Sequence, residues 1–211
     1  MIVTVGSDQA VAPDDGPVFL FDLDGTLTRE ELLPLLADEI GLGGMRELTD
    51  RTMQGEYGFD QSFRMRVDML RDVPLDVVAE IVRSVPVNEQ LMGWISERKE
   101  RCWVVTGNLD CWVEPWLDKW GLRGFTSTSM LTTSGIGIAP GGVLDKATVL
   151  PQFSSNFTAM AGDGANDAGI VMGADFGIGV QIIHTIPDLL LSAADCVVNS
   201  EGALCRILSR L

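Results

Sequence analysis

A short apolar run that ends in two aspartates constrains this chain more than any other stretch. Residues 18–21 read VFLF and are followed by DLDGTLT. Such a run is too short for a helix and is typical of a strand buried on both faces in a parallel sheet. Side chains two positions apart in an extended segment share a face, so Asp22 and Asp24 should point to one spot while Leu23 returns to the core. Gly25 allows the sharp turn that follows.

The spacing of these two carboxylates favours a bound cation. Two unpaired carboxylates a few ångströms apart repel each other, and without a cation the pKa of one of them is raised. A divalent metal ion is the simplest way to remove that repulsion. The alternative is a strand that merely ends in a polar turn.

Charge and composition exclude several classes of function. The 211 residues include 15 basic and 30 acidic side chains, which gives a net charge of −15 and disfavours nucleic acid and anionic membranes as partners. A small phosphorylated metabolite remains compatible, because a metal ion and a few local cations can outweigh a distant negative background. Residues 1–17 lack a signal sequence, and no uncharged apolar stretch reaches the roughly 18 residues of a membrane span. We expect residues 1–17 to form a loose leader.

The cysteines and the single histidine limit the metal sites, disulfides and nucleophiles that the chain can have. The four cysteines show no CxxC spacing and have no nearby histidine, so we expect neither a disulfide framework nor a zinc site, and a cytoplasmic location. His184 is the only histidine. Schemes in which histidine activates a serine or cysteine nucleophile would all depend on this one residue and are therefore disfavoured.

The remaining chain alternates between strand and helix patterns. Further apolar runs predict strands at residues 102–105, 157–161, 176–180 and 196–198. This alternation predicts a Rossmann-like α/β core, a parallel sheet with right-handed crossovers flanked by helices. Residues 43–85 show helical periodicity only, which indicates a small all-helical insertion after the first strand. We expect an α/β core and an inserted helical cap, made of residues 1–29 with 88–211 and of residues 30–87.

Local signals suggest where some elements begin and end. A regular helix should start near Leu32, and Thr28 with Glu31 matches a T-x-x-E capping box; a binding role for Glu31 is the alternative. Asn88 is placed to cap the helix that leads back to the sheet. Residues 132–142 contain four glycines and a proline and indicate a hairpin or a loop.

Polar motifs follow three of the expected strands. DLD follows the first, TGN the second, and GDGAND, residues 162–167, a later one, with Lys146 between the last two. Ligands of open parallel sheets bind at the carboxyl ends of the strands, so these motifs should converge on one site.

In order and character, these motifs resemble those of the haloacid dehalogenase superfamily, the Asp-nucleophile phosphotransferases, from Val18 to nearly the end of the chain. The resemblance implies that Asp22 attacks phosphorus and becomes an aspartyl phosphate, while Asp24 is general acid and then general base. It also implies that Mg²⁺ is held by the Asp22 carboxylate, the Asp24 main-chain carbonyl and the Asp163 carboxylate.

The same resemblance assigns the phosphate-binding groups. Thr106 and the Gly107 amide would bind the phosphoryl oxygens, and Lys146 would neutralise their charge. Asn166 would contact the phosphoryl end, and Asp167 would orient Lys146 or the metal shell. The alternatives are an exposed lysine at a helix start for Lys146 and a helix cap for Thr106.

The inserted segment resembles that of one branch of this superfamily. MQGEYGFDQSFRMRV looks like the helical cap of phosphoserine phosphatases, with its M-x-G-x-x-x-F-x-x-S-x-x-x-R-V pattern. By that likeness Arg66 would bind a substrate carboxylate, Glu31 would bind its ammonium group, and Met53 and Phe59 would line the pocket. The alternative for Arg66 is a solvated helix residue, because two further arginines flank it.

These observations predict a Mg²⁺-dependent phosphatase for a small phosphomonoester, with phosphoserine or a related phospho-amino acid as the candidate substrate. The second motif departs from the usual SGG of phosphoserine phosphatases, because TGN places the Asn108 side chain where glycine would leave room. Alternatives are transfer of the phosphoryl group to another small alcohol and, in another class, a non-catalytic metabolite-binding protein. A monomer and a homodimer fit the sequence equally.

Overall fold

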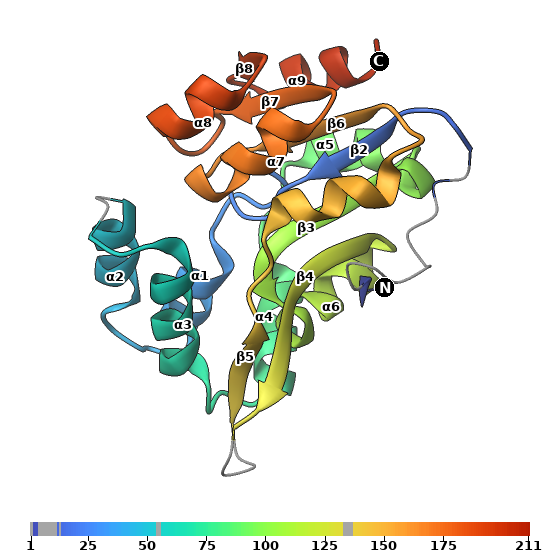
Figure 1. The fold of residues 1–211 in the computed structure, drawn as a ribbon. Coiled ribbons are helices and arrows are strands. Elements are labelled where there is room, and N and C mark those ends of the chain that lie inside the picture. Colours follow the sequence, from blue (N-terminus) through green and yellow to red (C-terminus); the bar gives the residue numbers. More distant parts are fainter. Residues whose placement is uncertain (1, 4–11, 13, 54–55, 133–136) are drawn as a thin grey trace.

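A parallel sheet is the centre of the fold (Figure 1). The structure is a computed structural model that describes residues 2–3, 12, 14–53, 56–132 and 137–211. The strand order of the sheet is β1-β4-β3-β2-β6-β7-β8, and neighbouring strands on this path pair in parallel (Figure 1). The predicted Rossmann-like α/β core is therefore confirmed. The strands are β1 (Ile2–Val3), β2 (Val18–Phe21), β3 (Cys102–Leu109), β4 (Arg123–Leu131), β6 (Thr158–Gly162), β7 (Phe176–Val180) and β8 (Cys196–Val198).

Strand β2 is fully apolar because it is covered on every side. It pairs with β3 on one edge and with β6 on the other. Phe19 and Phe21 pack into the hydrophobic core on one face of the sheet, and Val18 and Leu20 pack into the core on the opposite face. A strand buried in this way has no solvent-facing position that would select a polar residue.

Helices cover both faces of the sheet, as the alternating pattern predicts. The core that contains Phe19 and Phe21 also receives side chains from α5 (Glu89–Ser96), α6 (Asp110–Trp120) and α9 (Glu201–Leu208). The core that contains Val18 and Leu20 receives side chains from η2 (Lys146–Phe153) and α7 (Ala168–Gly173) and Leu190 of α8 (Asp188–Ala193). No sequence signal predicted the short helix α8.

A second group of helices is inserted between β2 and β3. These are α1 (Leu32–Glu39), α2 (Met45–Met53), α3 (Phe59–Leu70) and α4 (Leu75–Ser84). Helices α1, α2 and α3, here called the inserted helices, lie on the side to which the β2 arrow points, whereas α4 packs against α6 of the core (Figure 1). The inserted helices are thus positioned over the carboxyl end of β2.

The hairpin of β4 with β5 (Ile138–Gly142) supports α3 from the core side. The two strands pair antiparallel, which confirms the hairpin for the described part of residues 132–142; residues 133–136 lie outside the described residues. The Ile138 amide donates to the Arg71 carbonyl at the end of α3, at 2.8 Å. The core and the inserted helices are therefore joined here as well as through the chain that leads into α1.

Three local expectations need correction. Strand β3 extends to Leu109, so the TGN motif belongs to the strand instead of following it. Helix α1 begins at Leu32 as predicted, but Thr28 does not cap it, because its hydroxyl donates to the Leu23 and Glu30 carbonyls. Within the expected leader, Ile2–Val3 forms β1 beside β4.

Asn88 occupies the predicted cap position of α5, but its side chain has another partner. The side-chain amide donates to the Thr26 carbonyl at 2.7 Å, and no side-chain cap bond forms. The asparagine therefore ties the start of α5 to the turn that follows the DLD motif.

Two glycine-to-alanine substitutions should shift the free energy of unfolding in opposite directions. Gly93 lies in α5 and a Cβ added there meets nothing within 4 Å, so Gly93→Ala should stabilise by about 0.5–1 kcal/mol. A Cβ at Gly177 in β7 would lie 2.4 Å from the Val171 carbonyl oxygen, so Gly177→Ala should destabilise by about 1–3 kcal/mol. Urea unfolding measures both, and shifts of the same sign would contradict the packing described.

Candidate active site

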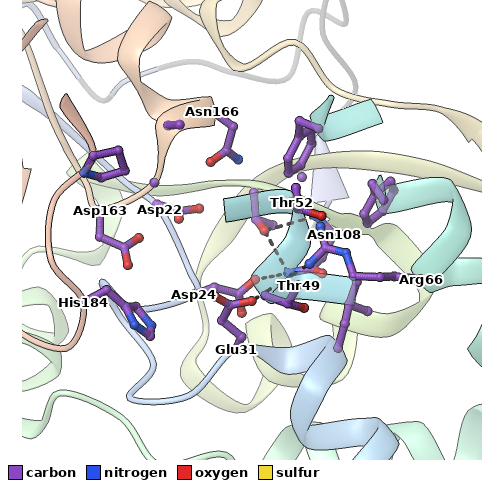
Figure 2. Close-up of a pocket in the computed structure, with 18 of the residues that line it drawn as sticks. Asp22, Asp24, Glu31, Thr49, Thr52, Arg66, Asn108, Asp163, Asn166 and His184 are labelled. Atoms are coloured by element: carbon purple, nitrogen blue, oxygen red, sulfur yellow. Dashed lines mark hydrogen bonds and ion pairs between the residues drawn. The ribbon is translucent and has the colours of Figure 1, made fainter. Parts of the chain in front are cut away.

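The aspartates at the ends of two adjacent strands meet in one pocket. Asp22 and Asp24 follow β2, Asp163 follows β6, and all three line the same cavity (Figure 2). Leu23 between the first two is fully buried, as the strand alternation predicts. Gly25 has φ +71°, and a Cβ there would lie 1.9 Å from Asp163 Oδ2. A glycine is thus required for the two acidic loops to approach each other.

Lys146, the first residue of η2, joins two of the aspartates. Its Nζ donates to Asp22 Oδ1 at 2.5 Å and to Asp167 Oδ1 at 2.6 Å. The second Asp167 oxygen accepts from the Gly164 amide at 2.9 Å. Lys146 is only 3% exposed, so the alternative of an exposed lysine at a helix start is wrong.

Negative charge exceeds positive charge in this cluster. Carboxylate oxygens of Asp22, Asp163 and Asp167 lie within 4.8 Å of one another. Burial, and then the neighbouring carboxylates, raise the pKa of Asp22 and that of Asp163. Burial alone would lower the pKa of Lys146, but Asp167 and Asp22 beside it raise that pKa.

This excess of negative charge suits a divalent cation with oxygen ligands. Asp167 has both oxygens engaged, one by Lys146 and one by a main-chain amide. Asp22 and Asp163 are therefore better placed to hold the ion, and it would lower the pKa of both carboxyl groups by direct attraction.

Asp24 is held separately from this cluster. Its Oδ1 accepts from the Leu32 amide at the start of α1 at 3.0 Å, and its Oδ2 accepts from Asn108 Nδ2 at 2.7 Å. Burial, and then the charge of Glu31, raise the pKa of Asp24 to about 6. A carboxyl group that exchanges its proton near neutral pH is suited to acid and base catalysis.

Thr106, Gly107 and Asn166, three of the four predicted phosphate-binding residues, line the same cavity, whereas Lys146 does not line it and contacts Asp22 from behind the cavity wall. Thr106 and Gly107 lie in β3, and Asn166 points into the cavity from η3 (Ala165–Asp167), the short helix after β6 (Figure 2). The N-cap of α6 is Leu109, so Thr106 is not the helix cap that was its alternative. A Cβ at Gly107 would lie 2.7 Å from Phe59 Cζ. Glycine at this position lets Phe59 of α3 approach the strand end.

Arg66 and Glu31 face each other on the side of the inserted helices. Arg66 is 8% exposed, and its Nη1 lies 3.9 Å from Glu31 Oε2. Its Nε is buried and has no hydrogen-bond partner among the described residues. Arg64 and Arg71 pair with acidic neighbours on the exposed face of α3. The alternative of a solvated helix residue is therefore wrong for Arg66.

The cavity between core and inserted helices is small, about 270 Å³. Phe59 lines it as predicted, whereas the side chain of Met53 lies outside the described part of the chain. Sequence reasoning did not predict several other lining residues, which are Leu33, Thr49, Thr52, Tyr57, Phe63, His184 and Pro187.

His184 shows why these lining residues were missed. It is the only histidine, and no motif surrounds it in the loop between β7 and α8. Its Nε2 is buried and has no hydrogen-bond partner in the part of the chain that the structure describes. Only the path of that loop past Gly25 brings the ring to the cavity.

The fold and the acidic strand ends place the chain among α/β hydrolases with a carboxylate-rich site under inserted helices. Residues 19–169 match the haloacid dehalogenase-like hydrolase family. The chain belongs to this family, in its phosphoserine phosphatase-like branch.

Relatives and solved structures agree with this assignment. The chain is 29% identical over 199 residues to a phosphoserine phosphatase of Methanocaldococcus jannaschii, covering 87% of this chain and 92% of the relative. It is 27% identical to a phosphoserine phosphatase of Archaeoglobus fulgidus, covering 88% of this chain but only 57% of that relative.

Two solved structures show how far the fold is shared. A substrate-bound phosphoserine phosphatase complex has a TM-score of 0.77 at 25% identity, covering 94% of this chain and 99% of that one. A hydrolase of the same family from Salmonella enterica serovar Typhi has a TM-score of 0.77 at 21% identity, covering 95% and 74% of the two chains. The second likeness concerns the fold alone.

Mg²⁺ should stabilise the folded protein through the acidic cluster. At 100 times its dissociation constant the ion contributes about 2.7 kcal/mol, which corresponds to a rise in Tm of roughly 5–10 °C for a chain of this size. Asp163→Asn should abolish this shift and, with EDTA present, should raise Tm above that of the wild type, because one repulsive charge is removed.

Differential scanning calorimetry with and without Mg²⁺ measures both effects. Asp68→Asn serves as the control, because Asp68 is an exposed residue of α3 paired with Arg71. A Mg²⁺-dependent rise in Tm that persists in Asp163→Asn would contradict the assignment of the cation to this cluster.

Proposed function

We propose that this chain is a Mg²⁺-dependent phosphatase that hydrolyses a small phosphomonoester through an aspartyl phosphate on Asp22. One observation carries the proposal: Asp22, bonded to the buried Lys146, lines the same cavity as a second carboxyl group, Asp24, whose pKa is raised to about 6 by burial and by the charge of Glu31. A protein that only bound a metabolite would have no need for that second group.

The two carboxyl groups divide the reaction between them. An Asp22 oxygen bonds to phosphorus while the ester P–O bond breaks, and the Asp24 proton passes to the departing alkoxide oxygen. A water molecule then attacks the aspartyl phosphate and gives its proton back to Asp24. Phosphate leaves with the water oxygen, and both aspartates return to their starting states.

Neighbouring residues would position the phosphoryl group. Thr106, the Gly107 amide, Lys146 and Asn166 are proposed to bind its oxygens, and Asp167 to orient Lys146. The Asp22 and Asp163 carboxylates and the Asp24 main-chain carbonyl would hold Mg²⁺. When bound, Mg²⁺ supplies positive charge against the phosphoryl oxygens.

Phosphoserine or a related phospho-amino acid is the proposed substrate. Glu31 and the buried Arg66 offer an acceptor for an ammonium group and a donor for a carboxylate, and the cavity of about 270 Å³ suits a small metabolite. Met53 and Phe59 would line this pocket. The similarity to proteins named phosphoserine phosphatases supports the same choice.

The division into domains follows from this function. We propose that residues 30–87 act as a cap over the core of residues 1–29 and 88–211. Because α4 packs against α6, cap movement would involve chiefly the inserted helices.

Location and partners complete the proposal. No helix in the described residues is long and apolar enough to cross a membrane, and all four cysteines are free. Free cysteines support a reducing compartment, and we propose the cytoplasm. We propose a small phosphorylated metabolite as partner, and neither nucleic acid nor membrane, in view of the net charge of −15.

Asp22→Asn should remove nearly all phosphatase activity. An amide is a poor nucleophile, and loss of a catalytic nucleophile costs roughly 10³-fold or more in kcat. Phosphate release with Mg²⁺ from a panel of phosphorylated amino acids, sugars and nucleotides measures this loss and the substrate preference together. Asp68→Asn should keep wild-type activity. Appreciable Mg²⁺-dependent turnover by Asp22→Asn would remove the mechanism.

Arg66→Ala should weaken binding of phospho-amino acids selectively. Loss of a charged hydrogen bond costs about 1.5–3 kcal/mol, so KM for phosphoserine should rise roughly 10-fold or more, whereas KM for p-nitrophenyl phosphate should change little. Arg64→Ala is the matched control, because Arg64 lies on the same helix but pairs with Asp60 at the surface. Equal effects of Arg66→Ala on both substrates would exclude the carboxylate contact.

A further inference from the structure

Asn108 stands where the usual second motif, SGG, has its second glycine, and it lines the cavity. It is 4% exposed, near the end of β3. Its Nδ2 donates to Asp24 Oδ2 at 2.7 Å and lies 3.2 Å from Thr106 Oγ1 (Figure 2). A glycine at this position, as in SGG, would offer Asp24 no side-chain donor.

The second oxygen of Asp24 is held by a different segment. Asp24 Oδ1 accepts from the Leu32 amide at 3.0 Å, at the first residue of α1. Two donors from opposite sides, one on β3 and one on the inserted helices, therefore fix the plane of one carboxyl group. Without Asn108 only the Leu32 amide remains, and the carboxyl can rotate about its Cβ–Cγ bond.

The two bonds can persist when Asp24 is protonated. A protonated carboxyl group keeps acceptor capacity beside its O–H, so the Asn108 and Leu32 amides can bond its oxygens before and after the proton leaves. Bonds to both oxygens restrict rotation of the group in either state.

We propose that Asn108 is a positioning residue that holds the Asp24 carboxyl in the orientation required for proton transfer to the leaving-group oxygen. This inference rests on the proposed function and deepens it, since it adds a residue that acts through the general acid. In the step concerned, the bond from an Asp22 oxygen to phosphorus forms, the ester P–O bond breaks, and the Asp24 proton ends on the alcohol oxygen.

The dependence on leaving group distinguishes this role from a structural one. An alkoxide is a poor leaving group and needs the proton, whereas p-nitrophenolate departs readily without it. A loss confined to the proton transfer therefore affects alkyl esters much more than aryl esters. General damage to the pocket, or to the nearby Thr106, would slow both reactions alike.

The test compares kcat/KM of Asn108→Ala for phosphoserine and for p-nitrophenyl phosphate. Because kcat/KM covers steps up to the first irreversible one, it reports on departure of the alcohol. We expect a fall of roughly 10–100-fold for phosphoserine, within the range of general acid catalysis, and less than threefold for the aryl ester. Asn156→Ala is the control. It loses hydrogen bonds to the Asp14 and Gly16 carbonyls, none of these residues lines the cavity, and it should leave kcat/KM unchanged for both substrates.

A double variant tests whether the two residues act as a unit. Asp24→Asn should show the same preference for the aryl ester, and adding Asn108→Ala to it should cause no further loss for phosphoserine. Equal losses for the two substrates in Asn108→Ala, or additive losses in the double variant, would overturn the inference. If Asn108→Ala fails to fold, Asn108→Ser takes its place, because the serine side chain is too short to reach Asp24. The loss of kcat/KM for phosphoserine relative to that for p-nitrophenyl phosphate should then be the same.

Failure of the inference is distinguishable from failure of the proposed function. If Asp24→Asn loses no more activity on phosphoserine than on p-nitrophenyl phosphate, the general-acid role of Asp24 is wrong, and the inference fails with it. If Asp24→Asn discriminates and Asn108→Ala does not, the proposed function stands and only the role of Asn108 is wrong.

Discussion

Electrostatic repulsion between buried carboxylates is the constraint on which the rest of this structure depends. Asp22 and Asp163 at two adjacent strand ends share one buried cluster with Asp167, and Lys146 neutralises only part of their charge. Removing one partner of a buried ion pair costs about 3–5 kcal/mol, so the lysine cannot be lost without destabilising the site. The remaining excess of negative charge would be offset by a divalent cation.

Asp24, the proposed general acid, links the core to the inserted helices. Asp24 is bonded on one side to Asn108 of β3 and on the other to the first amide of α1. Phe59 of α3 approaches so closely to Gly107 that a side chain there would collide with it. The position of the inserted helices is therefore coupled to the geometry of Asp24 and the β3 strand end.

The sequence predicted the fold and the acidic site because both follow from local patterns. The run VFLF and the alternation of strands and helices are sufficient for a parallel sheet, and its carboxyl edge gathers the motifs. The predicted capping box at Thr28 was wrong for two reasons. In the turn after Asp24, the Thr28 hydroxyl donates to main-chain carbonyls. The first amide of the helix, that of Leu32, donates to the Asp24 carboxylate instead. His184 and Thr49 could not be predicted, since only the path of the loop between β7 and α8 and the position of α2 bring them to the cavity.

The central claim is that the carboxylates of Asp22 and Asp163 share one divalent cation. A crystal structure of the protein grown with Mn²⁺, which binds the same kinds of oxygen ligands as Mg²⁺, tests it most directly through anomalous scattering. The account predicts a single strong anomalous peak within coordinating distance of an oxygen of each of the two carboxylates. A peak elsewhere on the molecule, or no peak at a concentration of Mn²⁺ that supports turnover, would contradict it.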